Sequence, residues 1–297
     1  MSNPKLLITG ANGKLGRQVV DHLINTFKVN TGDLVLTTRK IEDLNEYAQQ
    51  GIEVRQADFD QPETLETAFA GVDRLLLISI DVIGDRERLH TNAIKAAEKA
   101  GVKHISYTSM PAPEESPLIF AHEHKGSEQA IKNSDIPFYS ILRNNWYYEN
   151  LPEFNAAALA TKAWLTSAGS AKTNQLSRND LALAAAASIY KGEQQQRTRT
   201  LNGRDALSVK EMALAIKQIT DIEIQVIEMD DEGFTKQLEE VGLPAELIGM
   251  LVSLDQHNRA GFSEGDTKDF AELTGQEPQS FEGWLKDNKA QLIALAS

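Results

Sequence analysis

Three glycines near the start of the chain have the spacing of a turn that holds phosphate. Gly10, Gly13 and Gly16 form the pattern G-x-x-G-x-x-G between a short apolar run and an amphipathic stretch. Glycine lets the backbone approach a pyrophosphate closely, and a helix that begins there offers free N–H groups and a positive dipole end. This context predicts a nucleotide site, with an ordinary strand-to-helix turn as the alternative.

The end of the second apolar run indicates which dinucleotide binds. Proteins that prefer NAD place a carboxylate about 20 positions beyond the last glycine. This chain has Arg39 and Lys40 there, and no Asp or Glu lies between Leu34 and Ile41. A guanidinium and an ammonium suit a 2′-phosphate, so we predict NADP, with NADPH preferred over NADH. The alternative is that both cations are only solvated charges at a strand end.

Two further strand ends carry residues that suit the same cofactor. Asp58 and Phe59 follow the third apolar run, and we expect them to border the adenine. Ser79 follows the fourth run and is expected to line the cofactor. Both places also fit ordinary strand ends.

The common proton-transfer pair of short-chain reductases is absent from the sequence. That pair is a tyrosine with a lysine one helical turn later; the tyrosine supplies the proton, and the lysine lowers its pKa. None of the six tyrosines has a lysine four positions later.

A histidine occupies the helical stretch where the pair would be expected. His124 and Glu128 lie one turn apart, so we expect the carboxylate to orient the imidazole and favour its charged form. In this interpretation His124 faces the nicotinamide or the substrate and polarises it. The alternative is a surface helix with a salt-bridged pair. His122 and His124 point to different helix faces, so no metal site is predicted.

Amide and aromatic side chains follow the sixth apolar run. The stretch Arg143–Asn150 is expected at the carboxyl ends of the strands, where open α/β sheets bind ligands. Asn144, Trp146 and Tyr147 would cap the nicotinamide and form a wall of a flat apolar pocket. The alternative is an aromatic hinge between two parts of the chain. Ser177 is interpreted as a structural helix cap, with Asp180 in the first turn.

Apolar runs of strand length alternate with helical patterns through the first half of the chain. Such alternation predicts right-handed crossovers and a parallel sheet covered on both faces, so the expected fold is a doubly wound, Rossmann-like α/β sheet. The expected strands are 5–9, 34–38, 52–56, 74–79, 104–108 and 138–142, and the expected helices between them are 43–50, 62–69, 87–100 and 122–133.

The pattern changes after about residue 150. Helical stretches at 180–190, 209–219 and 232–241 predict a smaller, mostly helical C-terminal part, with a short strand candidate at 222–227. We expect an NADP-binding domain over 1–150, with 168–190 returning to it, and a smaller substrate-side domain over 151–297. The polar segment 192–199 is predicted to be an exposed loop.

Composition excludes several classes of protein. The 297 residues include no cysteine, which excludes disulfides, thiolate metal sites and cysteine nucleophiles. The formal net charge of −13 opposes binding to nucleic acid or anionic lipid. We find no targeting or membrane-spanning pattern and expect a cytoplasmic protein without nucleic-acid or membrane partners, with a homodimer as an open possibility.

Together, the glycine turn, Arg39, the missing tyrosine–lysine pair, His124 and the stretch LRNNWYYEN resemble the NmrA-like atypical short-chain dehydrogenases. Within that family the chain is most similar to the type 2 NAD(P)H:quinone oxidoreductases and the triphenylmethane reductases. Lys40 differs from the Asn that the quinone reductases usually carry there. The resemblance implies cofactor or pocket positions at Gly10, Asn12, Gly13, Leu15, Gly16, Arg39, Ser79, Arg143, Asn144, Trp146 and Tyr147, and we add Lys14 from the turn.

The resemblance also implies an activity. Hydride passes from NADPH to a quinone or a similar conjugated acceptor, and His124, Tyr147 and Asn144 are the residues expected at the reacting groups. Such acceptors give delocalised products and the proton can come from solvent, so a dedicated tyrosine acid is dispensable. The alternative is an NADP-binding redox sensor of the NmrA type, which binds without turnover.

Overall fold

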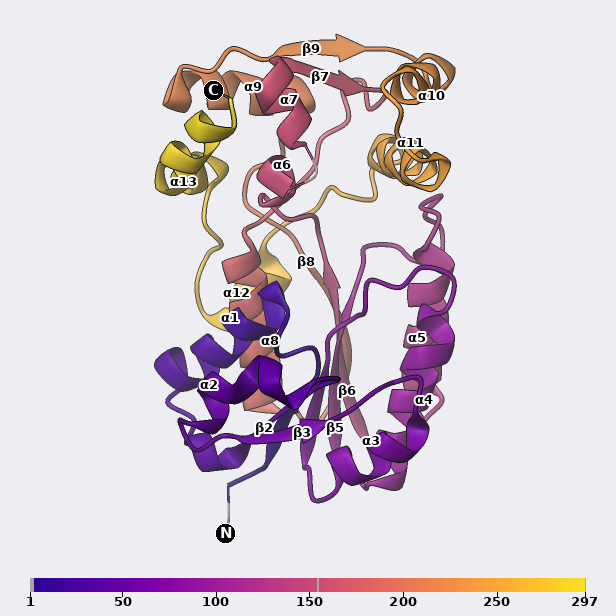
Figure 1. Cartoon of the computed structure of the whole chain (residues 1–297), viewed down its shortest axis with the longest axis vertical. Coiled ribbons are helices and arrows are strands. Elements are labelled where there is room, and N and C mark those ends of the chain that lie inside the picture. The colour runs from indigo at the N-terminus through magenta and orange to yellow at the C-terminus, as the bar shows by residue number, and fades with distance from the viewer. Residues whose placement is uncertain (1–2, 154, 297) are drawn as a thin grey trace.

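The computed structural model describes residues 3–153 and 155–296, and its centre is one large parallel sheet. The strands follow the order β3-β2-β1-β4-β5-β6-β8, and every neighbouring pair is parallel. This confirms the predicted doubly wound sheet (Figure 1). The strands are β1 (Leu6–Ile8), β2 (Leu34–Thr38), β3 (Glu53–Gln56), β4 (Arg74–Leu77), β5 (His104–Ser109), β6 (Phe138–Asn144) and β8 (Gln196–Leu201).

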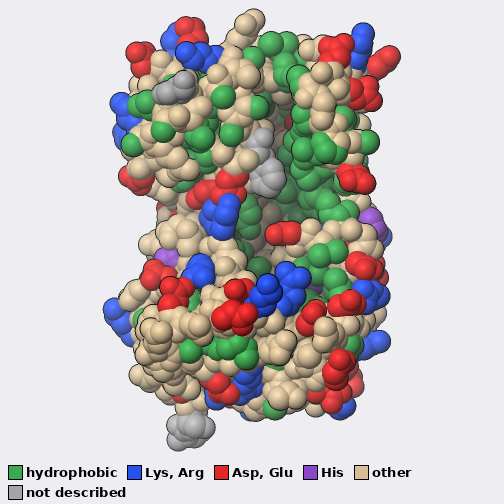
Figure 2. Space-filling view, viewed as in Figure 1, with side chains coloured by type: hydrophobic (Ala, Val, Ile, Leu, Met, Phe, Trp, Pro, Cys, Tyr) green, Lys and Arg blue, Asp and Glu red, His purple; other side chains and the backbone are tan. Residues whose placement is uncertain are grey.

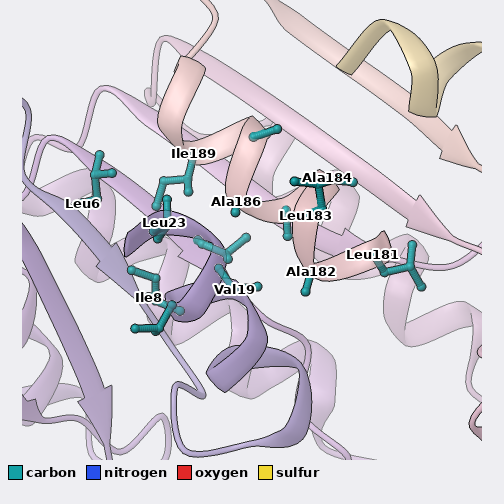
Figure 3. Close-up of a cluster of buried hydrophobic side chains, with 14 of the residues drawn as sticks. Leu6, Ile8, Val19, Leu23, Leu181, Ala182, Leu183, Ala184, Ala186 and Ile189 are labelled. Atoms are coloured by element: carbon teal, nitrogen blue, oxygen red, sulfur yellow. The ribbon is translucent and has the colours of Figure 1, made fainter. Parts of the chain in front are cut away.

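Helices cover both faces of this sheet because apolar side chains alternate between its two sides. One core cluster joins the sheet to the first helix and to the alanine-rich helix α8, and a second joins it to the helices between β3 and β6. Figure 3 shows the first cluster, where Ile8 lies with Val19, Leu23 and Ala186. The helices are α1 (Lys14–Asp21), α8 (Arg178–Lys191) and α12 (Lys268–Thr274) on the first face, and α3 (Pro62–Phe69), α4 (Arg86–Lys99) and α5 (Ala121–Lys132) on the second.

Two short segments deviate from the predicted helices. The turn Ile41–Leu44 is a 3-10 helix that leads into α2 (Asn45–Ala48), where one continuous helix over 43–50 was expected. Helix α1 passes into a π-helical segment, His22–Thr26.

The predicted loop over 192–199 is wrong for residues 196–199. These residues belong to β8, which pairs in parallel with β6 from Tyr139↔Gln196 to Asn144↔Leu201. Gln196, Arg197 and Thr198 are exposed because β8 is the edge strand. An edge strand needs little apolar character, so its polar composition was mistaken for that of a loop.

A smaller part of the chain lies above the carboxyl ends of the strands (Figure 1). It is mostly helical, as predicted, with a two-stranded parallel sheet of β7 (Ala163–Thr166) and β9 (Gln225–Glu228). Helix α8, strand β8 and helix α12 also follow residue 150 but lie on the large sheet, and the division at residue 150 stays a prediction. The helices of the smaller part are α6 (Asn150–Glu153), α7 (Ala156–Thr161), α9 (Val209–Thr220), α10 (Asp231–Glu240), α11 (Ala245–Arg259) and α13 (Phe281–Leu295).

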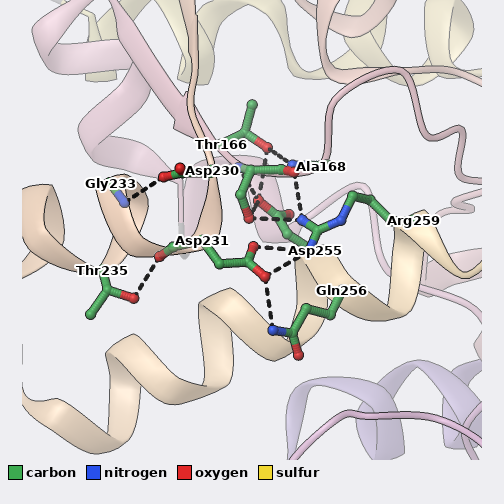
Figure 4. A network of polar contacts seen from close by, with 10 residues as sticks. Thr166, Ala168, Asp230, Asp231, Gly233, Thr235, Asp255, Gln256 and Arg259 are labelled. Carbon is green, nitrogen blue, oxygen red and sulfur yellow. Dashed lines mark hydrogen bonds and ion pairs between the residues drawn. The ribbon is translucent and has the colours of Figure 1, made fainter.

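A polar network fastens α11 to its neighbours in the smaller part (Figure 4). Asp255 accepts hydrogen bonds from the hydroxyl of Thr166, the last residue of β7, at 2.8 Å and from the N–H of Ser167, the next residue, at 2.7 Å. Arg259 forms an ion pair with Asp231 of α10 at 2.7 Å. Burial raises the pKa of Asp255, against the opposing effect of these hydrogen bonds. The network joins α11 to α10 and to the end of β7.

The helices of the described ranges are short. Helices α11 and α13 reach 15 residues each, whereas a helix needs about 20 apolar residues to cross a bilayer. Over residues 3–153 and 155–296, no helix has the length and apolar character that a membrane crossing requires.

Candidate functional site

The glycine turn connects β1 to α1, and a side chain at Gly10 or Gly16 would strain it. Gly10 has a φ of +59°, and its carbonyl accepts the N–H of Gly13 at 2.9 Å. A Cβ on Gly16 would lie 2.3 Å from the Gly10 oxygen and 2.8 Å from the Ala11 Cα. Because real Cβ atoms do not come that close to backbone, Gly16 is what allows the first turn of α1 to fold against Gly10.

The start of α1 offers its backbone N–H groups to a ligand. Gly13 is the N-cap residue and provides no side-chain hydrogen bond to the first turn, which also contains no acidic residue. The positive end of the helix dipole therefore has no capping carboxylate of its own, which suits an anion. Asn12 is exposed beside it, and its amide donates to Asp43 at 3.2 Å.

Two cations at the carboxyl end of β2 are free to meet a phosphate. Arg39 and Lys40 are exposed, and neither side chain has an ion-pair partner in the described part of the chain. By contrast, Arg17 and Lys14 nearby are paired with Glu46 and Glu153. The strand end thus carries two uncompensated positive charges.

The strand ends of β3 and β4 have mainly local contacts. The Asp58 carboxylate accepts from the Asp60 N–H at 3.0 Å within its own turn, and Phe59 is half-buried against His90. Ser79 and Thr108, at the ends of β4 and β5, are joined because the Ser79 N–H donates to the Thr108 hydroxyl at 2.8 Å. The proposed contacts of Asp58, Phe59 and Ser79 with a cofactor stay predictions.

His124 is buried, and it does not contact Glu128. It is only 5% exposed, so α5 does not present it on a surface. Its Nδ1 lies 2.8 Å from the Tyr107 hydroxyl, not against Glu128, so the predicted His124–Glu128 pair is wrong. Burial, with the nearby charge of Arg86, lowers the pKa of His124 well below its usual value. The imidazole is therefore neutral, and the expectation of a charged form is also wrong.

Glu128 instead forms an ion pair with Arg143. Its carboxylate accepts from the guanidinium at 2.7 and 2.9 Å, from the Ser109 hydroxyl at 2.8 Å and from Lys132 at 3.1 Å. Arg143 also pairs with Glu114 in the segment before α5. Arg143 therefore already has two carboxylate partners, and its proposed cofactor contact stays a prediction.

A buried polar network beside His124 was not predicted from the sequence. The Ile80 N–H donates to His90 Nε2 at 3.2 Å, so the proton on Nδ1 faces the Ser127 hydroxyl at 2.9 Å. Burial lowers the pKa of His90 to about 3. Arg86 and Glu123, both buried, form an ion pair at 3.1 Å. Arg86 and His90 are four positions apart on the buried side of α4, and polar residues on that apolar stripe were the available signal.

The last residue of β6, Asn144, and two aromatic residues just after it lie at the carboxyl ends of the strands. Asn144 is 7% exposed, and its side-chain oxygen has no hydrogen-bond partner in the described part of the chain. Tyr147 is half-buried with the Arg178 guanidinium 5.4 Å from its ring centre. Burial raises the pKa of Tyr147, so its phenol is neutral. Trp146 donates to the Ser263 hydroxyl at 2.8 Å and packs on the His257 ring of α11.

These residues fit a dinucleotide phosphate site. The closely packed glycines, the uncapped start of α1 and the two unpaired cations lie at the same ends of β1 and β2, and the unpartnered Asn144 oxygen lies at the end of β6. Figure 2 shows a hollow with apolar side chains between the two parts of the molecule, above these strand ends. The predicted cap at Ser177 is confirmed, since its hydroxyl accepts the Asp180 N–H at 3.0 Å.

Comparisons with known proteins all indicate the same family. The model of the NmrA-like family matches residues 2–285. Quinone oxidoreductase 2 of Escherichia coli is 35% identical over 270 residues, which are 91% of this chain and 93% of that protein. The NAD(P)H azoreductase of Xenophilus azovorans is 22% identical over 286 residues, covering 96% of this chain and 98% of that protein.

Solved structures agree with these matches. The NADPH-dependent quinone oxidoreductase of Escherichia coli, in complex with NADPH, superposes with a TM-score of 0.88 at 34% identity, covering 97% of this chain and 99% of that one. The Citrobacter sp. triphenylmethane reductase, in complex with NADP(H), superposes with a TM-score of 0.85 at 32% identity over the same shares. The similarity therefore covers the large sheet and the smaller part together.

Proposed function

The chain belongs to the NmrA-like family, and from this premise we propose that it is a reductase that transfers hydride from NADPH to quinones or similar conjugated acceptors. The observation that carries the proposal is the phosphate turn at Gly10–Gly16 together with the unpaired Arg39 and Lys40 at the next strand end. Relatives at 35% and 32% identity that act on quinones and triphenylmethane dyes support the acceptor class.

The first part of the chain would hold the cofactor. The glycine turn and the start of α1 face the pyrophosphate, while Arg39 and Lys40 bind the 2′-phosphate through charge-assisted hydrogen bonds. The buried oxygen of Asn144 is available to the carboxamide of the nicotinamide. NADPH, when bound, supplies the hydride. The chain's own contribution is to orient the two reacting rings and to exclude water from them.

The acceptor would lie in the hollow between the two parts of the molecule. Trp146 and Tyr147 offer flat aromatic surfaces beside the strand ends, and α11 packs against Trp146 through its His257 ring. We propose residues 1–150, with 168–190, as the NADP-binding domain and the rest as the substrate-side domain. This division leaves the reacting rings at the boundary between them.

His124 would act on the acceptor as a neutral hydrogen-bond donor. Its Nδ1 faces the Tyr107 hydroxyl, and its Nε2 has no partner in the described part of the chain. When the Tyr107 hydroxyl donates a hydrogen bond to Nδ1, the single proton of the neutral imidazole is on Nε2, which can donate to a carbonyl oxygen that gains negative charge. The proton that completes reduction of the acceptor comes from solvent.

Steady-state oxidation of NADPH tests the proposed activity. Addition of a simple benzoquinone or naphthoquinone should cause continuous loss of NADPH absorbance, faster than with NADH at equal concentration. Tight binding of NADPH without turnover on quinones, dyes or aldehydes would instead favour the sensor.

We further propose a small-molecule acceptor as the main partner, in the cytoplasm, with neither nucleic acid nor membrane bound. The formal charge of −13 supports this, because it repels both polyphosphate and anionic lipid. A homodimer is a further proposal. Sedimentation at micromolar concentration tests it, and a monomer there would reject it.

A further inference from the structure

A carboxylate from the smaller part lies at the phosphate turn. Glu153 is the last residue of α6, and its Oε1 is 2.9 Å from the Nζ of Lys14. Lys14 is the first residue of α1, directly after Gly13. The ion pair therefore connects the smaller part to the place where the pyrophosphate of a dinucleotide would lie.

Glu153 is held in this position independently of Lys14. Its two carboxylate oxygens accept from Nη2 of Arg178 at 2.9 and 3.0 Å. The Arg178 side chain is only 11% exposed, lies over the Tyr147 ring, and its backbone N–H donates to Glu149 at 2.9 Å. The Lys14 side chain, by contrast, is 68% exposed and free to turn. If Lys14 moves, the carboxylate stays where it is.

Glu153 is ionised at neutral pH. Burial raises the pKa of its carboxyl, but the hydrogen bond from Lys14 and the charge of Arg178 outweigh this effect, so the net direction is downward. A pyrophosphate carries about two negative charges and would use the Lys14 ammonium as a counterion. The carboxylate and the pyrophosphate then compete for one cation.

We infer that Glu153 is a positioning residue that weakens dinucleotide binding and speeds its release by competing for Lys14. The inference rests on the proposed function, because it needs a dinucleotide at Gly10–Gly16. It gives the smaller part a direct influence on cofactor exchange. An enzyme that must release NADP⁺ in every cycle gains turnover from such a competitor.

Glu153→Gln tests this role, since the amide keeps the shape of the side chain and loses its charge. The Kd for NADPH and for NADP⁺, measured by calorimetry, should fall about fivefold, in the range of a partly exposed ion pair. The release rate, measured by stopped-flow fluorescence, should fall with it. Glu282→Gln is the matched control, because Glu282 forms a comparable ion pair with Lys286 far away on α13 and should change neither quantity.

A double-mutant cycle with Lys14→Met tests whether Glu153 and the dinucleotide compete for Lys14. In the Lys14→Met background, Glu153→Gln should tighten binding by less than twofold. Equal tightening in both backgrounds, or no tightening in the single variant, would overturn the inference. Glu153→Ala also removes the ion-pair partner of Arg178, and it should likewise lower the Kd for NADPH. A native protein that binds neither coenzyme would reject the proposed function instead, so the two failures are distinguishable.

Discussion

We propose that one side chain, Arg39, sets the choice between the two nicotinamide coenzymes. Arg39 is exposed and has no carboxylate partner in the described ranges, so its charge is not neutralised before a ligand arrives. NADP differs from NAD only by its 2′-phosphate. In this fold, the end of β2 is the part of the protein that contacts the 2′ position of the adenosine ribose. We therefore expect the coenzyme preference to depend on this one strand end.

Arg39→Ala should raise the KM for NADPH roughly tenfold to a hundredfold and leave that for NADH almost unchanged. A hydrogen bond between charged groups is worth about 1.5–3 kcal/mol, which corresponds to this range. Arg197→Ala is the control, because Arg197 is exposed on β8 at the far edge of the sheet. Equal effects on both coenzymes would reject the 2′-phosphate contact.

A second prediction at this scale concerns the buried imidazole. His124→Ala should lower kcat about tenfold with saturating NADPH, the value of one neutral hydrogen bond. Tyr107→Phe should lower kcat less, because His124 stays but its tautomer is no longer fixed. Because the pKa of His124 is far below its usual value, kcat should show no loss as pH rises from 6 to 8. If kcat is unchanged in His124→Ala, His124 does not act on the acceptor and only packs in the core.

At the scale of elements, the turn between β1 and α1 is the most constrained feature of the site. The close contact at Gly16 and the positive φ at Gly10 are properties of the turn, not of a ligand. The same geometry that packs α1 on the sheet also exposes its first N–H groups. Folding and phosphate binding are thus coupled in one segment.

Gly16→Ala should destabilise the fold by about 1–3 kcal/mol and weaken NADPH binding more than tenfold, because the new methyl group would meet the Gly10 carbonyl. Thermal unfolding and calorimetry measure the two effects. Gly249→Ala in α11 is the matched control, since its Cβ would meet nothing within 4 Å. That variant should gain about 0.5–1 kcal/mol from helix propensity. A Gly16→Ala protein with native stability and affinity would contradict the close packing.

At the scale of the whole molecule, buried neutral histidines couple the stability of the fold to pH. Burial lowers the pKa of His90 to about 3, and those of His104 and His257 to about 4. In the unfolded chain these groups titrate near 6.5. Between 6.5 and 4 the unfolded state therefore binds more protons, so the stability present above pH 6.5 is lost as pH falls through this window.

The Tm should therefore fall steadily from pH 6.5 to pH 5, with up to about 1.4 kcal/mol lost per pH unit for each buried histidine. Asp255, whose pKa is raised by burial, acts in the opposite sense at the acid end. His104→Gln should flatten the curve, because it removes one titrating group. A Tm that is constant over this range would show that the imidazoles are not buried as described.

The sequence by itself determined the alternation of strands and helices, the phosphate turn and the two cations after β2. These features are local: glycine spacing, apolar runs and a missing carboxylate can be seen within a few neighbouring residues. The same locality explains the mistake at 196–199, because an exposed edge strand carries no apolar pattern and β6 alone makes it a strand.

Only the tertiary structure decided which side chains meet. Glu128 is one helical turn from His124, but its carboxylate forms an ion pair with Arg143 on β6. The His124 imidazole is hydrogen-bonded to Tyr107 on β5. Likewise Glu153 and Lys14 are far apart in the chain and form an ion pair because α6 lies over the turn. A buried charge is stabilised by the nearest opposite charge in space, whatever its place in the sequence, and burial itself fixes whether an imidazole is charged.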